Sequence, residues 1–128
     1  MALPRSHRLK GRRVFDRLYR SGRRHHGEFL VLRCLEAIPS LLPPDQAGHP
    51  SSPWRCGVVV SSKVHKRAVQ RNRLRRLVHN HLLTELQGIR HPGGRWLLIS
   101  FKPGSSELSP TELLGECSQL LKQAGLTA

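Results

Sequence analysis

The chain has 128 residues, a length that predicts a single domain. Lys and Arg number 22 against 8 Asp and Glu, and the resulting net charge of +14 favours nucleic acid or an anionic membrane surface as the partner. No apolar run approaches the ~20 residues that a membrane span needs, and no secretory signal is evident, so we expect a cytoplasmic protein without a membrane segment.

The first expected element is a short helix at residues 10–20. Val14 and Leu18 are i,i+4 neighbours, as are Phe15 and Tyr19, so this helix would carry an aliphatic pair and an aromatic pair. From spacing alone, an aromatic pair of this kind is more often part of a core than a binding surface. Because the aliphatic pair offers the core a face of its own, the aromatic pair can instead be exposed.

Two strands and a long loop are expected next. Residues 29–35 are mostly apolar, and their alternation places Arg33 on the side that faces away from the apolar core. The segment 37–53 contains five Pro and is predicted to be a loop, long for a compact domain. Residues 54–62 contain three consecutive valines and form the second expected strand.

The second half of the chain predicts a helix, a strand and a final helix. The main helix is expected at residues 66–86, a third strand at 95–101, and a last helix after Ser109, where S-P-T-E forms a capping box with Pro at the first helical position. Apolar positions recur in the main helix at i, i+3, i+4, i+7 and i+8, in the order Leu74, Leu77, Val78, His81 and Leu82.

This order of helix, strands, helix, strand and helix predicts an α+β fold. We expect a two-layer α/β sandwich in which helices pack on a sheet of at least three strands. Residues 1–128 would form a single RNA-binding domain, and this domain would include a Pro-rich loop at about 37–53.

Residues 61–76, SSKVHKRAVQRNRLRR, are the most informative stretch. They contain seven Lys or Arg and no Asp or Glu. A solvated helix usually alternates the sign of its charges, because opposite charges at i,i+4 support the helix. Charge that the chain leaves uncompensated favours a bound polyanion. Arg supplies 17 of the 22 bases, and its planar guanidinium favours nucleic acid over lipid headgroups.

No residue pattern predicts catalysis by the chain itself. The eight acidic residues are scattered, whereas two-metal hydrolysis needs clustered carboxylates. The spacing of the histidines does not support an acid and base pair for metal-free RNA cleavage. The three cysteines lie far apart, without CxxC spacing, which disfavours a zinc site or a disulfide framework. We therefore expect no catalytic residue, no metal ligand and no cofactor bound by the protein.

The chain resembles the protein subunit of bacterial ribonuclease P over nearly its whole length. The strongest element is Arg71-Asn72-Arg73, with Ala68-Val69 before it and Arg75-Arg76 after it. The opening string from His7 to Gly22, with Phe15 and Tyr19 at the family's spacing, is a second element. Lys102-Pro103, after an apolar strand and before a capped terminal helix, is the third. Three elements in the right order make the resemblance specific.

The resemblance implies a fold like a domain of a small-subunit ribosomal protein, with a left-handed crossover between parallel strands, although the general rule favours the right-handed form. It implies that the protein binds a catalytic RNA and the 5′ leader of precursor tRNA, assists removal of that leader and broadens the range of substrates. The RNA partner would perform the hydrolysis with Mg2+. No obligate protein partner and no membrane contact are implied.

The resemblance also implies two sets of site residues. A cleft between the first helix and the sheet would hold the leader. The main helix at 66–86 would bind the catalytic RNA. Its Arg71 and Arg73 project to different sides of the helix, and its Asn72 can contact RNA or brace the backbone. The expected contacts to the catalytic RNA are Lys63, Lys66, Arg67, Arg71, Asn72, Arg73, Arg75 and Arg76, and the expected contacts to the leader are Phe15, Tyr19, Arg33 and Arg12.

The sequence departs from the family pattern at two of these places. Lys66-Arg67 stand where the family often has Gly-Asn, and Arg33 stands where an aromatic residue is common. Guanidinium stacking or phosphate pairing would then replace ring stacking at Arg33. Two other classes of protein stay open on the residues alone. A ribosomal or RNA-packaging protein would share the charge, and an independent endoribonuclease would cleave RNA without help.

Overall fold

The sheet has four strands and mixed direction. The computed structural model describes residues 5–43, 53–88 and 94–127, and its sheet follows the order β1-β2-β4-β3. β1 pairs with β2 and β2 with β4 in antiparallel fashion, whereas β3 and β4 are parallel neighbours. The strands are β1 (Arg23–His26), β2 (Leu30–Glu36), β3 (Trp54–Val59) and β4 (Arg95–Phe101).

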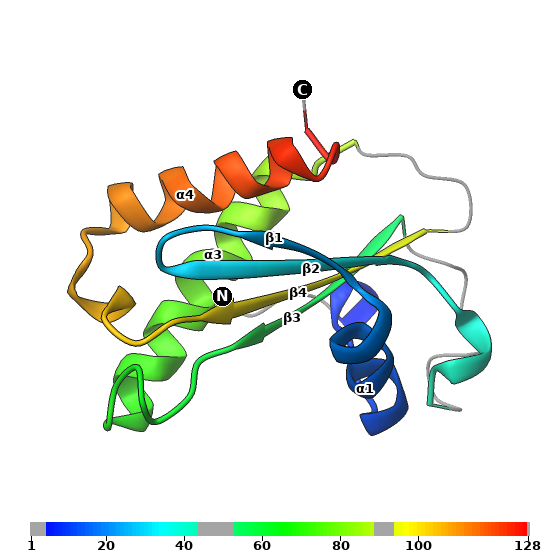
Figure 1. Ribbon diagram of the computed structural model, residues 1–128, viewed down its shortest axis with the longest axis horizontal. Coiled ribbons are helices and arrows are strands. Elements are labelled where there is room, and N and C mark those ends of the chain that lie inside the picture. Colours follow the sequence, from blue (N-terminus) through cyan, green and yellow to red (C-terminus); the bar gives the residue numbers. More distant parts are fainter. Residues whose placement is uncertain (1–4, 44–52, 89–93, 128) are drawn as a thin grey trace.

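Two helices cover one face of this sheet (Figure 1). Helix α3 (Ala68–Glu85) connects the parallel strands β3 and β4, and α4 (Pro110–Gln123) packs beside it. The expected crossover is therefore present, and its hand stays a prediction. The larger core forms between these helices and the sheet, where apolar side chains from alternate strand positions meet Val78, Leu82, Leu113 and Leu121. Burial of these side chains supplies the main driving force for folding.

Helix α1 (Arg12–Ser21) packs on the opposite face of the sheet (Figure 1). Its Val14 and Leu18 are fully buried against Trp96 and Leu98 of β4. The aliphatic pair therefore faces the core, as predicted. The α+β class is confirmed, and the sandwich of the sheet with α3 and α4 has this helix on its second face.

The first part of the Pro-rich loop belongs to the same smaller core. A short 3-10 helix, η2 (Pro39–Leu41), follows β2, and Ile38, Leu41 and Leu42 pack against the buried side chains of α1. The five Pro of residues 37–53 predict only a loop there, and they give no sign that its apolar residues join a core. Residues 44–52 lie outside the described part of the chain.

Strand β1 was not predicted. Its sequence, RRHH, has no apolar alternation, and none of its residues is fully buried. It lies at the edge of the sheet, where the antiparallel pairing with β2 makes it a strand. Charged edge strands are typical of proteins that avoid pairing with further strands. A strand of this kind can be recognised only from its pairing with a neighbouring strand, because its own sequence has no strand pattern.

The turn between β1 and β2 is fixed by side chains from distant elements. The carboxylate of Glu116 on α4 accepts hydrogen bonds from the backbone N–H groups of Glu28 at 3.1 Å and Phe29 at 2.9 Å. Lys102, from the third family element, donates its ammonium to the carbonyl of Gly27 at 2.8 Å. These contacts tie the edge hairpin to the larger core.

The boundaries of the elements differ from the predicted ones by a few residues. Helix α1 begins at Arg12 because Gly11 has a φ of 107°, which a helix does not allow. Helix α3 begins at Ala68 because Arg67 is extended. Strand β3 ends at Val59, three residues early, because the chain turns at Ser61. The predicted capping box and N1 proline of α4 are confirmed.

Three further points complete the description. Gly22 caps α1 and donates its backbone N–H to the carbonyl of Leu18. Two more 3-10 helices, η1 (Arg5–His7) and η3 (Ser105–Glu107), were not predicted. The string His91-Pro92-Gly93-Gly94 predicts a turn, and it lies outside the described residues except for Gly94.

Candidate RNA interface

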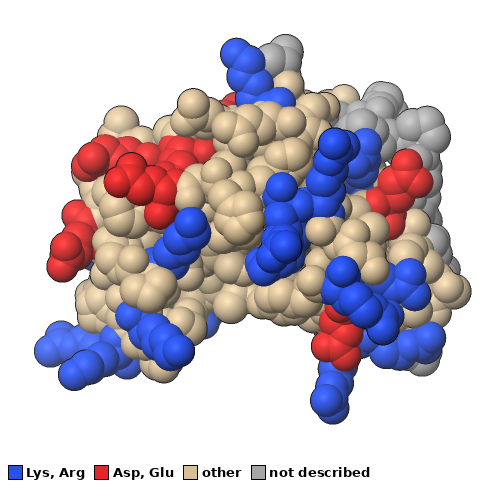
Figure 2. Space-filling view, viewed as in Figure 1, with Lys and Arg blue, Asp and Glu red and all other residues tan. Residues whose placement is uncertain are grey.

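Most negative side chains lie apart from the two main groups of positive side chains on the surface. In Figure 2, Lys and Arg gather over α1 and over the end of the molecule where α3 begins, whereas the largest group of acidic side chains lies where α4 begins and single acidic side chains lie elsewhere. This separation agrees with the sequence, in which the residues after Gly104 contain three Glu and one Lys. A surface with such separated charge can orient a polyanion before contact.

The basic segment spans a turn and the start of α3. Lys63 lies in the turn after β3, and Lys66 and Arg67 precede the helix, all three exposed. No side chain caps the N-terminus of α3, and no acidic residue lies in its first turn. The free backbone N–H groups therefore add a partial positive charge to the Lys and Arg side chains.

Arg71 braces the backbone at the start of this segment. Its Nη1 donates hydrogen bonds to the carbonyls of His65 at 3.0 Å and Lys66 at 2.8 Å. The guanidinium thus holds the approach to α3 in place, and one edge of it is occupied. Lys66 takes part through its backbone alone, so its ammonium stays available.

Asn72 also braces its own helix. Its Oδ1 accepts a hydrogen bond from Arg75, and its backbone carbonyl accepts one from Nε of Arg76 at 3.4 Å. The alternative that Asn72 acts locally is therefore supported by these contacts. The two arginines are held along the helix surface and still present guanidinium N–H groups.

The arginines of α3 divide between two sides of the helix. Arg73 and Arg76 line a groove toward α4, whereas Arg75 lies near His79 and Arg8. Within residues 5–43, 53–88 and 94–127, no Lys or Arg of the segment 63–76 forms an ion pair with a carboxylate. The positive charge of residues 63–76 therefore has no carboxylate partner nearby in the sequence or in the described part of the structure. It remains available to phosphates.

His79 occupies an electropositive position that sequence analysis did not single out. Burial lowers the pKa of His79 from 6.5 to about 4, and the charges of Arg75 and Arg8 add to this effect. Its buried Nδ1 has no hydrogen-bond partner among the described residues. His79 is therefore neutral at pH 7, and a phosphate placed nearby would favour its protonation.

Replacing His79 with glutamine should reduce the loss of stability at acidic pH. The unfolded chain binds a proton at His79 below about pH 6.5, whereas the folded chain does so only near pH 4, so stability falls as the pH drops through this window. After solvent screening, the contribution at pH 5 is about 1 kcal/mol. Urea unfolding at pH 7 and pH 5 measures it. An equal loss in wild type and His79→Gln would contradict the prediction.

Phe15 packs at the junction of α1 and the sheet. Its half-buried ring lies over Gly57 of β3, so close that a Cβ at Gly57 would be 2.7 Å from ring carbon Cε1. Any larger residue at position 57 would therefore force the ring to move. One edge of Phe15 belongs to the smaller core, and the ring lies at the border of that core.

Tyr19 and Arg33 form a second contact on this surface. Tyr19 is 49% exposed, and Cζ of Arg33 lies 4.8 Å from the centre of its ring. Arg33 therefore points away from the larger core, as its place in the alternation of β2 predicted. Nε of Arg33 is buried and has no hydrogen-bond partner in the described ranges. The pair presents a flat cation–π stack at the border of the sheet.

Arg12 lies one helical turn from Phe15. It forms an i,i+4 ion pair with Asp16, with 3.9 Å between Nε and Oδ2, and its side chain is highly exposed. An exposed pair of this kind contributes little and dissociates easily. The four expected leader contacts therefore lie together, with Arg12 the most weakly fixed. We call Phe15, Tyr19, Arg33 and Arg12 the α1 surface.

A second basic group on α1 was not distinguished by sequence analysis. Arg13, Arg17 and Arg20 share a side of the helix and line a hollow of about 220 Å³ together with Asp16 and Leu41. Nε of Arg17 is buried there without a hydrogen-bond partner among the described residues. The helical spacing i, i+4, i+7 was visible in the sequence, but the position of η2 beside it was not.

Arg55 is a buried arginine that the sequence did not reveal. It is only 5% exposed, and its Nη1 donates to the carbonyl of Arg8 at 3.1 Å. Burial lowers the pKa of Arg55. The neighbouring Trp54 stacks on His7, whose Nδ1 lies 2.9 Å from the carbonyl of Trp54. These contacts join the N-terminal segment to β3, next to His79.

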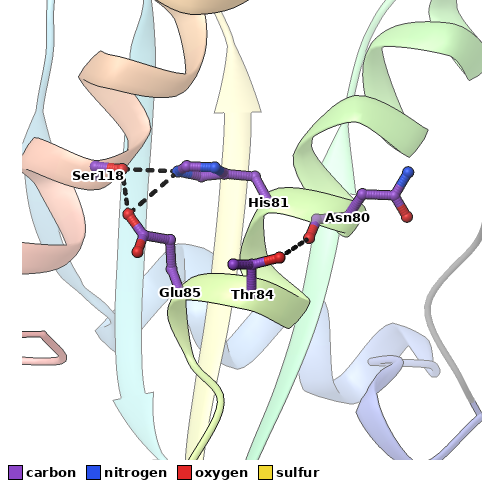
Figure 3. Close-up of polar contacts among 5 residues, drawn as sticks. All are labelled: Asn80, His81, Thr84, Glu85 and Ser118. Carbon is purple, nitrogen blue, oxygen red and sulfur yellow. Dashed lines mark hydrogen bonds and ion pairs between the residues drawn. The ribbon is translucent and has the colours of Figure 1, made fainter.

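A Ser, His and Glu group links α3 to α4 (Figure 3). Nε2 of His81 lies 2.7 Å from Oγ of Ser118, whose hydroxyl donates to Glu85 at 2.5 Å. The same Nε2 lies 3.5 Å from Glu85. A nucleophilic triad needs the carboxylate on the other ring nitrogen and the hydroxyl proton directed at histidine. This group therefore links two helices, and His81 of the apolar stripe is partly buried between them.

No metal site and no membrane span are found in the residues that can be described. No group of three or more His, Cys, Asp or Glu could hold a metal ion there. The three cysteines are free and buried, and burial raises the pKa of each thiol. No described helix is both long and apolar enough to cross a bilayer.

The fold and this surface define a small, basic protein of the α+β class whose surface suits a polyanion. Comparison with known proteins narrows the class. Residues 3–125 match the family model for ribonuclease P. The chain is 55% identical over 126 residues to the ribonuclease P protein component of Parasynechococcus marenigrum (strain WH8102) and 50% identical to that of Synechococcus sp. (strain CC9902), with 98% of both chains covered in each case.

The fold comparison agrees. The RNase P protein of Staphylococcus aureus gives a TM-score of 0.76 at 18% identity, covering 95% of this chain and 98% of the other. The Thermotoga maritima protein gives 0.68 at 24% identity, covering 91% and 96%. This chain therefore belongs to the ribonuclease P protein family, whose members are the protein component of an endoribonuclease that has a catalytic RNA as its partner and processes the leader of precursor tRNA.

Proposed function

We propose that the chain uses two separate surfaces in this holoenzyme. The segment 63–76 binds phosphates of the ribonuclease P catalytic RNA through Lys63, Lys66, Arg67, Arg71, Asn72, Arg73, Arg75 and Arg76. The α1 surface, on the other face of the sheet, binds the single-stranded 5′ leader of precursor tRNA. The observation that carries the first assignment is the set of seven Lys and Arg with no carboxylate partner among the described residues.

The α1 surface suits a leader whose sequence varies. Base stacking on aromatic rings tolerates every base and contributes ~1–3 kcal/mol per base. Phe15 and the stack of Tyr19 on Arg33 offer such platforms, and Arg12 can exchange its exposed partner Asp16 for a phosphate. This tolerance explains how the protein would broaden the range of substrates that the RNA accepts.

The chain binds and positions, and it does not hydrolyse. Among its described residues, no group of three or more His, Cys, Asp or Glu could hold a metal ion, and the hydroxyl of Ser118 donates a hydrogen bond to Glu85. Magnesium held by the RNA would supply the activated water for phosphodiester hydrolysis. By placing positive charge beside both the catalytic RNA and the leader, the protein lowers the repulsion between two polyanions. We expect this reaction in the cytoplasm, without an obligate protein partner.

Precursor tRNA cleavage with separated components tests this function. Three reactions at low magnesium should contain the protein alone, the catalytic RNA alone, and both together. We expect cleavage only in the third, because the RNA supplies the chemistry and the protein supplies the affinity. Cleavage by the protein alone would show an independent endoribonuclease. Failure to stimulate the RNA would show a packaging protein.

A further inference from the structure

A groove separates the basic side of α3 from the segment that leads into α4. Its volume is about 440 Å³, within the range of pockets that hold small organic groups. Leucines from both sides form its apolar walls, namely Leu74 and Leu77 of α3, Leu108 after η3 and Leu113 of α4. Three of these leucines are only partly buried, so apolar surface stays accessible in the middle of a highly charged region.

The rim of this groove is polar and positive on the α3 side. Arg73 and Arg76 line it, together with the amides of Gln70 and Asn80. Neither arginine pairs with a carboxylate among the residues that the structure describes. The opposite rim is formed by Ser106 and Pro110, and the hydroxyl of Ser106 already donates to the carbonyl of Val64.

The charges around the groove give its occupant a direction. Glu107 and Glu112 lie near the α4 side, where Figure 2 shows the acidic side chains, so phosphates are disfavoured there. The guanidinium groups of α3 favour phosphates on the other side. A ligand with a flat apolar part and an anionic backbone would place the flat part between the leucines and the backbone along Arg73 and Arg76. A nucleotide that has left its stack has this chemistry.

We propose that this groove binds one unstacked nucleobase of the RNA that lies on the segment 63–76, while Arg73 and Arg76 pair with the flanking phosphates. The amides of Gln70 and Asn80 carry both donors and acceptors, so they can read the edge of the base. The inference rests on the proposed contact between this segment and the catalytic RNA. It adds a site that reads a base next to contacts that read only charge.

A tryptophan placed in the groove tests this proposal. Leu108 lines the groove and lies outside the basic segment, so Leu108→Trp fills the site and leaves every Lys and Arg in place. Leu114→Trp is the matched control, because it adds the same ring to α4 at a partly buried position that does not line the groove. Should Leu108→Trp fail to fold, Asn80→Trp covers the groove from an exposed position.

The measurement is chemical probing of the 2′-hydroxyls of the catalytic RNA with and without protein. We expect wild type and Leu114→Trp to change the reactivity of the same unpaired nucleotide, and Leu108→Trp to leave it unchanged. Removing the base of that nucleotide should weaken binding of wild type by about 5- to 100-fold and should not weaken binding of Leu108→Trp further.

Two results would separate this inference from the proposed function. If Leu108→Trp and Asn80→Trp protect the RNA as wild type does, the groove holds no base, although the phosphate contacts remain. The same result is expected if a peptide or a second copy of the chain occupies the groove, so it overturns the proposal. Loss of the proposed function itself would appear as an unchanged salt dependence when Arg73 is replaced.

Discussion

Replacing Phe15 with alanine should weaken binding of precursor tRNA by about 10-fold or more and leave binding of mature tRNA unchanged. The ring lies at the border of the smaller core, over Gly57, and its removal deletes a stacking platform for the leader. Affinities for the two RNAs, measured with the assembled holoenzyme, report the effect. Mature tRNA has no leader, so it controls for every other contact.

Two further variants distinguish stacking from packing. Phe15→Leu keeps apolar bulk over Gly57 and removes the aromatic face, so it should lose leader binding with a smaller loss of stability than alanine. Phe101→Leu changes a buried ring in the larger core, and it should lower stability without affecting the difference between the two RNAs. An equal loss of affinity for precursor and mature tRNA in folded Phe15→Ala would refute the leader role.

Gly57→Ala should displace the ring of Phe15, because residue 57 lies directly beneath that ring. The new methyl group would lie 2.7 Å from Cε1 of Phe15, a distance that forces the ring to move. Overpacking of this kind typically costs 1–3 kcal/mol. Combining Gly57→Ala with Phe15→Ala should restore part of the stability, and a thermal unfolding series would reveal this coupling.

Arg73→Ala and Arg71→Ala should both weaken assembly with the catalytic RNA, but for different reasons. Arg73 makes no carboxylate pair among the described residues, so its loss should reduce the slope of log affinity against log salt by about one and leave folding intact. Arg71 holds the carbonyls of His65 and Lys66, so its loss should also lower the free energy of unfolding by roughly 1–2 kcal/mol.

The measurement is binding of the catalytic RNA over a range of salt concentrations, paired with urea unfolding of each free protein. Arg71→Lys is a useful control, since a single ammonium keeps the charge but is less suited to bridging two carbonyls. It should retain most of the salt slope and lose part of the stability. An unchanged slope in Arg73→Ala would show that this side chain does not contact a phosphate.

Most helices and strands could be predicted because their signals are local. The stripe of Leu74, Leu77, Val78 and Leu82 repeats with the helical period, and the capping box at Ser109 marks a helix start in four residues. Strand β1 could not be predicted, since its four polar residues pair with β2 only after β2 lies in the sheet. Period and propensity describe a segment, whereas an edge strand depends on its neighbour.

In the candidate sites too, local features could be predicted from the sequence, whereas the arrangement of the side chains could not. The excess of Lys and Arg at 63–76 was evident in the sequence, but its arrangement was not. That Arg71 braces two carbonyls depends on the turn that leads into α3. That His79 is neutral beside Arg8, and that Arg55 is buried, depend on contacts between distant segments. The stack of Tyr19 on Arg33 joins α1 to β2 in the same way.

Charge, helical period and the Arg71-Asn72-Arg73 string are properties of neighbouring residues, so they alone predicted a basic α+β protein that binds a polynucleotide. The tertiary structure alone decided that α1 lies across the sheet from α3, and that Arg73 and Arg76 border an apolar groove. These features arise when apolar faces from separate segments are buried together, and that burial fixes which polar side chains stay on the surface.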